Sequence, residues 1–483
     1  MSGIAGIAEK GKKELVRKAL TKIAYRGGAG RVIQTHDCST LGQVWPKAHS
    51  SCTIDIDRHG VVLDGEVYNW TDLAVGATCP VDALESAYHS KGPEFVAQID
   101  GPFALAIARP DGVFLARSLL GQPPLYYGRR KEAICFASEV KALLGWAEEI
   151  AEFPVGHYYE PAQGFVRWRK LETREPKDLP AEEIAAQLRQ RLVMSVRKRI
   201  GDGNIGSWLS GGLDSATMTA LGSRQVRRLH TFAVGLEGAP DLECARTVAE
   251  FLGTRHHEKI CAPAEILAVL PWVIYHLESF DALLIRSSIT NFLVGKLAAE
   301  RVPAVFSGEG GDELFAGYNY LKDLETEELP DELVDITKRL HNTALQRVDR
   351  CSSSHGLVAK TGFLDRDVLD FALRIPPEMK IVKDERQVEK WILRRALEGL
   401  LPDDILCRPK VKFWEGAGVG NLLAAHAEEV VSDSEFAAGR KLPNGSELNT
   451  KEELFYYRIF KEHFGEELDP TVVGRTKGAP VAK

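Results

Sequence analysis

The segment that most constrains this chain is Ser210-Gly211-Gly212-Leu213-Asp214-Ser215. It follows a short apolar stretch typical of a buried strand, Ile205 to Leu209, and precedes a helix-like run that ends near Gly222. A strand, a glycine-rich turn and a helix in this order build an anion site, because backbone N–H groups and the positive end of the helix converge there. The pattern therefore predicts a phosphate-binding loop between a strand and a helix.

An aspartate inside this loop indicates a metal as well as a phosphate. Asp214 would repel a phosphate by itself, so it makes best sense as a Mg²⁺ ligand, while Ser210 and Ser215 can donate hydrogen bonds to phosphate oxygens. No Gly-Lys-Ser/Thr follows, so this is not a Walker motif. The loop is similar to the pyrophosphate loop of enzymes that cleave ATP into AMP and pyrophosphate. The alternative is a glycine-rich turn that caps a helix and binds no ligand.

Composition excludes several classes of protein. The 483 residues allow two or three domains, and 44% hydrophobic with 27% charged residues is ordinary for a soluble protein. A net charge of −7 argues against a protein that coats nucleic acid. We expect no membrane span and no secretory leader. The eight cysteines are scattered and form no C-x-x-C pair, so we expect reduced thiols in a cytoplasmic protein.

The first third of the chain predicts packed antiparallel sheets. Up to about Lys170, short strand-like runs are split by Gly, Pro or Asp, and only two helical patterns interrupt them. The expected strands are 61–63, 103–107, 113–116 and 133–137, and the expected helices are 13–23 and 81–89.

After a polar, proline-marked linker at 172–180, strands alternate with long helices, which indicates a parallel α/β sheet. Beyond Leu321 the pattern is almost purely helical. We expect domains at 1–172 and 181–468 and a loose tail at 469–483. The helices expected here are 181–199 and 245–252, and the strands are 229–234 and 302–306.

The motifs together resemble those of the B-type, glutamine-dependent asparagine synthetase family. The resemblance is strong from about 205 to 420 and partial before 170. It implies a two-domain α/β protein, with an N-terminal-nucleophile (Ntn) hydrolase-like αββα sandwich followed by a parallel-sheet synthetase domain of the adenine nucleotide α-hydrolase type. The blocks that carry it are Ser210–Ser215, Phe232–Leu236, Pro240–Leu242, Gly253–Glu258, Ser307–Glu313, Phe315–Tyr318 and Arg408–Phe413 with Glu415-Gly416.

The resemblance implies an ATP-dependent amide ligase that releases AMP and pyrophosphate and uses Mg²⁺. A carboxylate is a poor electrophile until AMP is attached to it, after which a nitrogen nucleophile can displace AMP. The family pattern assigns the pyrophosphate loop to Ser210, Gly211, Gly212, Asp214 and Ser215, the metal to Asp214 and Asp312, and the nucleotide pocket to Val234 and Gly308. It assigns catalysis to Glu309, as the acid–base group, and Lys410. The acidic Glu309–Glu313 cluster has the alternative interpretation of a solvated turn.

The N-terminal site departs from the family pattern. Ser2 stands where the family has its nucleophilic cysteine, Arg26 is retained, and the family's Asn-Gly-Glu reads Asp64-Gly65-Glu66. A carboxylate at Asp64 would repel the oxyanion that an asparagine supports. We therefore expect a degenerate glutaminase site and ammonia as the nitrogen donor. Hydrolysis of a different amide by Ser2 is the alternative.

The acceptor region also differs. The family's Thr-Thr-Ile-Arg reads Leu283-Leu284-Ile285-Arg286, so Arg286 could still pair with a substrate carboxylate. Aspartate is the leading acceptor by resemblance. Two alternatives remain open. One is an intramolecular amide former like β-lactam synthetase, a family that uses a Tyr–Glu pair; here Glu309 with Tyr318 or Tyr320 could form such a pair. The other is a non-catalytic nucleotide-binding relative. The oligomeric state is open too, with a homodimer as one option.

Overall fold

The computed structural model describes residues 1–48, 59–383, 387–410 and 416–465, together with 468, 472, 474 and 476. Two compact units make up the chain. The first contains Met1–Leu171, Asp349–Val358 and Lys461–Gly474, and the second contains Glu172–Val348, Ala359–Phe460 and Arg475–Lys483. Most of the expected tail, 469–483, lies outside the described residues.

The first unit contains two sheets whose strand pairs are antiparallel, as predicted. The six-stranded sheet has the order β2-β3-β1-β8-β7-β9, and the five-stranded sheet has the order β11-β10-β6-β5-β4. The strands are β1 (Gly3–Ile7), β2 (Gly30–Thr35), β3 (Thr40–Trp45), β4 (Val61–Gly65), β5 (Phe103–Arg109), β6 (Gly112–Arg117), β7 (Tyr126–Arg130), β8 (Ala133–Ala137), β9 (Glu148–Glu152), β10 (His157–Glu160) and β11 (Gly164–Arg167).

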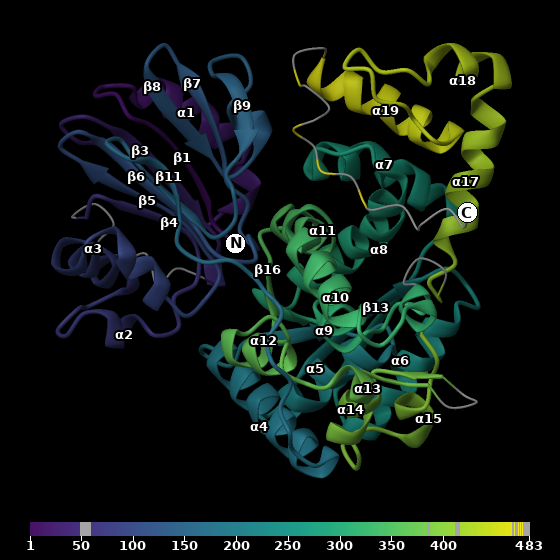
Figure 1. The fold of residues 1–483 in the computed structure, drawn as a ribbon. Coiled ribbons are helices and arrows are strands. Elements are labelled where there is room, and N and C mark those ends of the chain that lie inside the picture. Colours follow the sequence, from purple (N-terminus) through teal and green to yellow (C-terminus); the bar gives the residue numbers. More distant parts are fainter. Residues whose placement is uncertain are drawn as a thin grey trace. The chain divides into compact units, whose positions relative to one another are not determined.

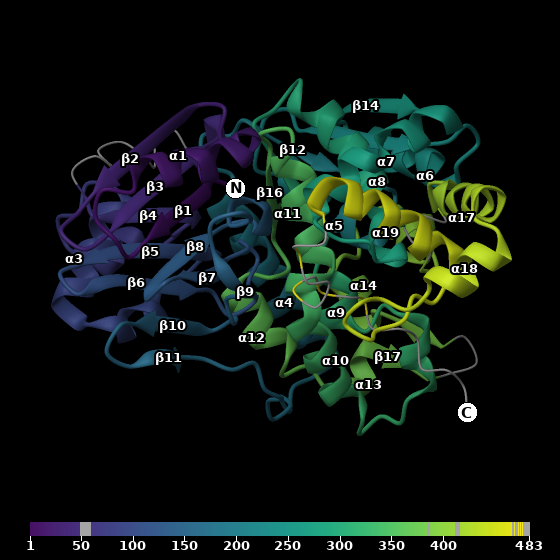
Figure 2. The ribbon, with the colours of Figure 1, turned by 90° about the horizontal axis from the view of Figure 1, so that it is seen from above.

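The alternation of side chains along β5 shows how these sheets are layered. Ala104 and Ala106 join a core between the two sheets, together with residues such as Ile4 and Phe136. Phe103, Leu105 and Ile107 point to the opposite face, because successive strand residues face opposite sides. That face packs on helix α3 (Pro80–Lys91), and helix α1 (Lys13–Lys22) covers the six-stranded sheet (Figures 1 and 2). The predicted αββα sandwich is confirmed.

The second unit is built on a five-stranded sheet with the order β14-β13-β12-β15-β16. The pairs β12–β13, β12–β15 and β13–β14 are parallel, as predicted. The strands are β12 (Ile205–Trp208), β13 (His230–Gly235), β14 (Arg255–Ile260), β15 (Ala304–Ser307) and β16 (Val358–Thr361). The purely helical pattern expected after Leu321 was wrong for β16, a fully buried edge strand of only four residues, and for the short β17 (Ile381–Val382) and β18 (Val388–Glu389).

Helices surround this sheet, and α4 begins and ends as predicted. The longer ones are α4 (Ala181–Arg199), α5 (Leu213–Ser223), α6 (Pro240–Leu252), α7 (Pro263–Leu277), α8 (Ala282–Ala299), α10 (Leu329–Lys338), α11 (Ala344–Ser353), α17 (Val419–Val430) and α19 (Lys451–Phe464). The shorter ones are α2 (Trp70–Leu73, in the first unit), α9 (Gly311–Phe315), α12 (Arg366–Ala372), α13 (Pro377–Lys380), α14 (Trp391–Ala396), α15 (Asp403–Leu406) and α18 (Asp433–Gly439).

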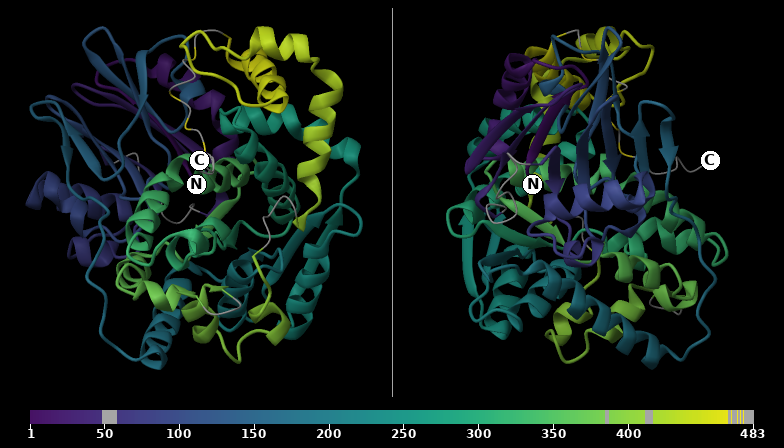
Figure 3. Two further views of the ribbon diagram at one scale, coloured as in Figure 1. Left: turned by 45° about the vertical axis from the view of Figure 1, so that its right-hand side comes forward. Right: turned by 90° about the vertical axis from the view of Figure 1, so that its left-hand side faces the viewer.

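Helix α8 is a long apolar helix of the second unit. Its 18 residues have a mean hydropathy of 1.2, so by length and composition alone this segment could span a membrane. In the structure 72% of it is buried, as in the core helix of a folded domain. It packs against β13 and α7, and α17 lies beside α7 and α8 (Figure 3, yellow-green on teal).

Candidate functional site

The Ser210–Ser215 loop joins β12 to α5 as predicted, and Gly211 determines its shape. Gly211 has a φ of +72°, and a Cβ there would lie 2.3 Å from the Cβ of Cys244 on α6. Only glycine fits both constraints. The Ser215 hydroxyl donates to the Gly212 carbonyl at 3.0 Å and accepts from the Ser210 amide at 3.2 Å. The loop is therefore held in shape by its own residues.

A second glycine-rich segment, which follows β15, packs directly on this loop. A Cβ on Gly308 would lie 2.8 Å from the Ser215 nitrogen, and one on Gly311 would lie 2.5 Å from Cγ of Asp214. Because β12 and β15 are parallel neighbours, the loops at their carboxyl ends meet at one edge of the sheet. This places Asp312 beside Asp214.

Two lysines and these two aspartates form a buried ion cluster. Lys390 Nζ lies 2.7 and 2.6 Å from the two carboxylate oxygens of Asp214 and 2.5 Å from Oδ1 of Asp312. Lys410 Nζ lies 2.6 Å from Oδ2 of Asp312. The four charges sum to zero, and the Lys390 side chain is only 2% exposed. Lys390 thus bridges the two carboxylates that were expected to hold Mg²⁺.

Burial and neighbouring charge affect the two carboxyl groups differently. Burial raises the pKa of Asp214, a shift that Lys390 opposes and the nearby Asp312 reinforces. Burial also raises the pKa of Asp312, but Lys390 and Lys410 outweigh it, so that pKa falls below its usual range. The aspartates in turn raise the pKa of Lys410 despite its burial. The two carboxylates therefore depend on the neighbouring lysines for charge compensation.

Two adjoining cavities meet at this cluster. The first has a net positive charge around the Ser210–Ser215 loop, with four basic residues (Lys390, Arg394, Arg408 and Lys410) against three acidic ones (Asp214, Asp241 and Glu389). The second shares Ser210, Asp214, Ser215, Asp241 and Lys410 with the first and continues past β13 and α8. Its other lining residues include Trp208, Phe232, Val234, Val294, Gly308, Glu309 and Arg347. The first cavity can therefore bind an anion, whereas the second combines an apolar wall with charged residues that include Asp241, Glu309 and Arg347.

Glu309 lies in the second cavity and pairs with an arginine that sequence analysis missed. Arg347 Nη2 donates to Oε1 of Glu309 at 2.6 Å. The tyrosines considered as partners of Glu309 bond elsewhere, since Tyr318 donates to Glu313 at 2.5 Å and Tyr320 donates to Glu332 at 2.7 Å. The Tyr–Glu arrangement considered for an intramolecular amide former is therefore not formed by Glu309.

Arg286 is not among the described residues that line either cavity. Its Nε donates to both carboxylate oxygens of Glu452, at 2.9 and 3.1 Å, and its Nη2 also bonds that carboxylate. Tyr456 donates to the same group at 2.6 Å. The guanidinium expected to bind a ligand carboxylate is thus occupied by Glu452 of α19.

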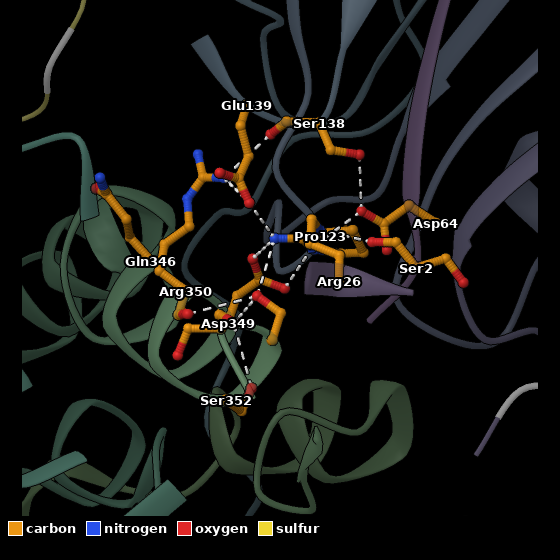
Figure 4. Close-up of polar contacts among 12 residues, drawn as sticks. Ser2, Arg26, Asp64, Pro123, Ser138, Glu139, Gln346, Asp349, Arg350 and Ser352 are labelled. Atoms are coloured by element: carbon orange, nitrogen blue, oxygen red, sulfur yellow. Dashed lines mark hydrogen bonds and ion pairs between the residues drawn. The ribbon is translucent and has the colours of Figure 1, made fainter. Parts of the chain in front are cut away.

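In the first unit, Ser2, Arg26 and Asp64 meet in a buried cluster (Figure 4). Arg26 donates to the Ser2 carbonyl at 2.7 Å, to Asp64 at 3.2 Å, to Glu139 at 2.8 Å and to Asp349 at 2.8 and 3.0 Å. A further bond reaches Ser353 at 3.1 Å, and Arg350 and Lys141 add two cations beside Glu139. Three cations therefore face three carboxylates, and every side of the Arg26 guanidinium is engaged by the protein itself.

Asp64 is the incompletely hydrogen-bonded carboxylate of this cluster. Its Oδ2 accepts from Ser138 at 3.0 Å, but Oδ1 is buried without a hydrogen-bond partner among the described residues. Burial raises its pKa to about 6, although Arg26 opposes the shift. Gly65, with a φ of +125°, ends β4, and Glu66, which follows it, accepts from Tyr68 at 2.9 Å.

Three important residues escaped sequence analysis: Lys390, Arg347 and Asp349. Each lies far in sequence from its partner, and Lys390 is 176 positions from Asp214. Lys390 directly precedes α14 and belongs to no motif, and Arg347 and Asp349 lie in the amphipathic α11. Their local sequence therefore does not distinguish them from surface charges. Only pairing in the folded chain identifies them.

Family comparisons agree with this architecture. Residues 1–186 match the glutamine amidotransferase domain model, and residues 187–335 and 325–479 match the asparagine synthase model. An amidotransferase-type sandwich joined to a parallel-sheet synthetase fold defines a class of carbon–nitrogen ligases. The chain belongs to the asparagine synthetase family, and it is a carbon–nitrogen ligase.

Relatives match along most of their length. The glutamine-hydrolysing asparagine synthetase 2 of Arabidopsis thaliana is 35% identical over 84% of this chain and 75% of its own. A probable glutamine-hydrolysing asparagine synthetase of Schizosaccharomyces pombe is 35% identical over 86% and 82%. Among solved structures, the B. subtilis glutamine PRPP amidotransferase with ADP and GMP has a TM-score of 0.30, 13% identity and coverage of 53% and 65%. A glutamine-dependent NAD⁺ synthetase of Acinetobacter baumannii with ADP has a TM-score of 0.25, 12% identity and coverage of 77% and 55%.

Proposed function

We propose that this protein makes asparagine from aspartate, ATP and ammonia, by way of an aspartyl-adenylate and with release of AMP and pyrophosphate. The observation that carries the proposal is the cluster of Asp214, Asp312, Lys390 and Lys410 beside the Ser210–Ser215 loop, at the junction of the two cavities. The names of the relatives support asparagine as the product.

In this proposal the basic cavity binds the triphosphate. The loop amides and the Ser210 and Ser215 hydroxyls donate to phosphate oxygens, and Lys390 and Lys410 neutralise charge as pyrophosphate leaves. The two aspartates have the oxygen ligands that Mg²⁺ prefers and would hold the metal in this proposal, with Lys390 beside them. Bound there, Mg²⁺ would supply further charge neutralisation on the phosphates.

Glu309 is the proposed general base of the second step. Ammonia attacks the acyl carbon of the adenylate, and the attacking nitrogen must lose a proton as the amide forms and AMP departs. Glu309 lies in the cavity next to the phosphate loop, with Arg347 holding one of its carboxylate oxygens. That bond fixes the orientation of the carboxylate and leaves Oε2 for the nitrogen.

Ammonia, not glutamine, is the proposed nitrogen donor because the first unit has an unfavourable hydrolytic site. Asp64 places an acidic group where an oxyanion would develop, and Arg26 is fully engaged by internal partners. A negative charge beside a developing oxyanion raises the barrier to hydrolysis. The test compares asparagine formation with ammonium and with glutamine, and measures glutamate release. Robust glutamine turnover that disappears in Ser2→Ala would overturn this part.

The adenylation step has its own test. We expect labelled pyrophosphate to exchange into ATP only when aspartate is present, across a panel of carboxylic acids. Asp214→Asn should abolish exchange while leaving the protein folded, and Asp202→Asn, an exposed aspartate of the same unit, is the matched control. Nucleotide binding without exchange for any acid would instead support a non-catalytic relative.

A further inference from the structure

Helix α8 presents polar atoms to the second cavity that have no hydrogen-bond partner in the described part of the chain. Oγ1 of Thr290 and Oδ1 of Asn291 are both buried without a hydrogen bond among the described residues. The two side chains belong to residues that are 1% and 3% exposed and that line the cavity. A buried amide oxygen without a donor is costly, so these atoms indicate a ligand that supplies one.

The position of these atoms limits what that ligand can be. The loop and the lysines account for the phosphate end of a nucleotide, and neither Thr290 nor Asn291 lines the basic cavity. Both line the second cavity together with Val294, which is one turn further along α8 and on the same face. A nucleotide with its phosphates on the loop would direct its base into this second cavity.

Chemistry favours the base over the amino-acid substrate as the partner of Asn291. The charged groups of an amino acid need charged partners, and in this cavity Asp241, Glu309 and Arg347 supply them. The wall formed by Asn291, Thr290 and Val294 offers only neutral polar and apolar atoms. Phe232 and Val234 of β13, against which α8 packs, add further apolar surface. A neutral heterocycle with one exocyclic donor suits this wall.

We propose that Asn291 reads the 6-amino group of adenine, with Oδ1 accepting one of its hydrogens. Asparagine is suited to this edge because its amide can pair with the 6-amino group and an adjacent ring nitrogen at once. Guanine carries an acceptor oxygen at that position and would leave Oδ1 without a donor. The inference rests on the proposed use of ATP and assigns α8 a part in selecting the nucleotide.

The test measures selectivity, not activity. The full-length protein is titrated calorimetrically with ATP and with purine riboside triphosphate, which lacks the 6-amino group, in the presence of Mg²⁺. We expect the wild type to prefer ATP by about tenfold, the value of one neutral hydrogen bond to a buried group. Asn291→Leu should reduce this preference to less than twofold. Ser287→Ala is the control, because Ser287 is buried on the same helix but bonds internally to Leu283 and Leu284.

Several outcomes would overturn the inference. Equal binding of both nucleotides by the wild type would do so, as would a preference that persists in the variant. If Asn291→Leu does not fold, Asn291→Ala is measured in its place and judged in the same way. A change confined to the dependence on aspartate would move Asn291 to the acceptor site. If the wild type bound neither nucleotide, the proposed function itself would fail. That outcome is a loss of binding, whereas failure of the Asn291 inference alone leaves binding intact and shows no selectivity that depends on Asn291.

Discussion

The unsatisfied Asp64 carboxyl group leads to a quantitative prediction about stability. Its pKa is about 6 in the folded protein because burial disfavours the charged form, against 3.8 as the ordinary value. A folded state that holds this proton more tightly than the unfolded state loses stability as pH rises from about 4 to about 6. The difference between the two pKa values corresponds to about 3 kcal/mol at neutral pH and above.

Asp64→Asn keeps the shape of the side chain and removes this cost. We expect the variant to be more stable than the wild type at pH 8. This advantage in the free energy of unfolding should be about 2 kcal/mol larger at pH 8 than at pH 4.5, because much of the cost of the charged Asp64 is absent at the lower pH. For a unit of this size that is a difference of roughly 4–8 °C in the Tm advantage, measurable by scanning calorimetry. Asp37→Asn, at a side chain that is 92% exposed in the same unit, is the control.

Two results would refute this reasoning. If the advantage of Asp64→Asn were the same at both pH values, titration of Asp64 would not be its cause. If the variant were destabilised increasingly as pH rose, the negative charge of Asp64 would be needed to balance Arg26, Arg350 and Lys141, and the cluster would depend on full charge pairing.

Three further outcomes follow from the synthetase site. Lys390→Met should reduce pyrophosphate exchange by about 100-fold or more, because it removes a hydrogen-bond donor to the leaving pyrophosphate. Partial rescue of exchange by Lys390→Arg would support this role, and undiminished exchange in Lys390→Met would contradict it. Gly211→Ala should lower the free energy of unfolding by more than about 2 kcal/mol, since it combines a left-handed backbone with a 2.3 Å clash. Gly212→Ala, whose Cβ would have 3.4 Å of room, should cost much less in urea denaturation, and equal costs would refute the argument. Arg347→Met should lower kcat for amide formation and leave KM for ATP near its wild-type value; a change in KM alone would place Arg347 in nucleotide binding.

Sequence analysis anticipated the fold where the pattern was local. The alternating strands of the first unit, the helix α4 and the strand–loop–helix around Ser210 follow from periodicity and turn residues that lie within a few positions of each other. Strand β16 was missed because four buried residues, two of them Lys360 and Thr361, carry no usable period.

The roles assigned to Glu309, Lys410 and the loop residues remain predictions, although the structure brings all of them to the same two cavities. Arg286 differs from the rest, since Glu452 already occupies its guanidinium. A retained arginine in a family motif could not reveal that partner, which comes from a helix 166 positions away.

The sequence alone determined the strand–loop–helix around Ser210 and the two sheet types, because strand period, glycine turns and helix starts depend on short-range sterics and hydrogen bonds. Membership in the ligase family followed from the order of its motifs. Tertiary structure alone decided how the charges are balanced. It places Lys390 between Asp214 and Asp312 and pairs Glu309 with Arg347. It also brings Asp349 to Arg26, which is 323 positions away in the sequence. Burial is the physical reason, since a charge removed from water must find a counter-charge, and packing of distant segments determines which one is within reach.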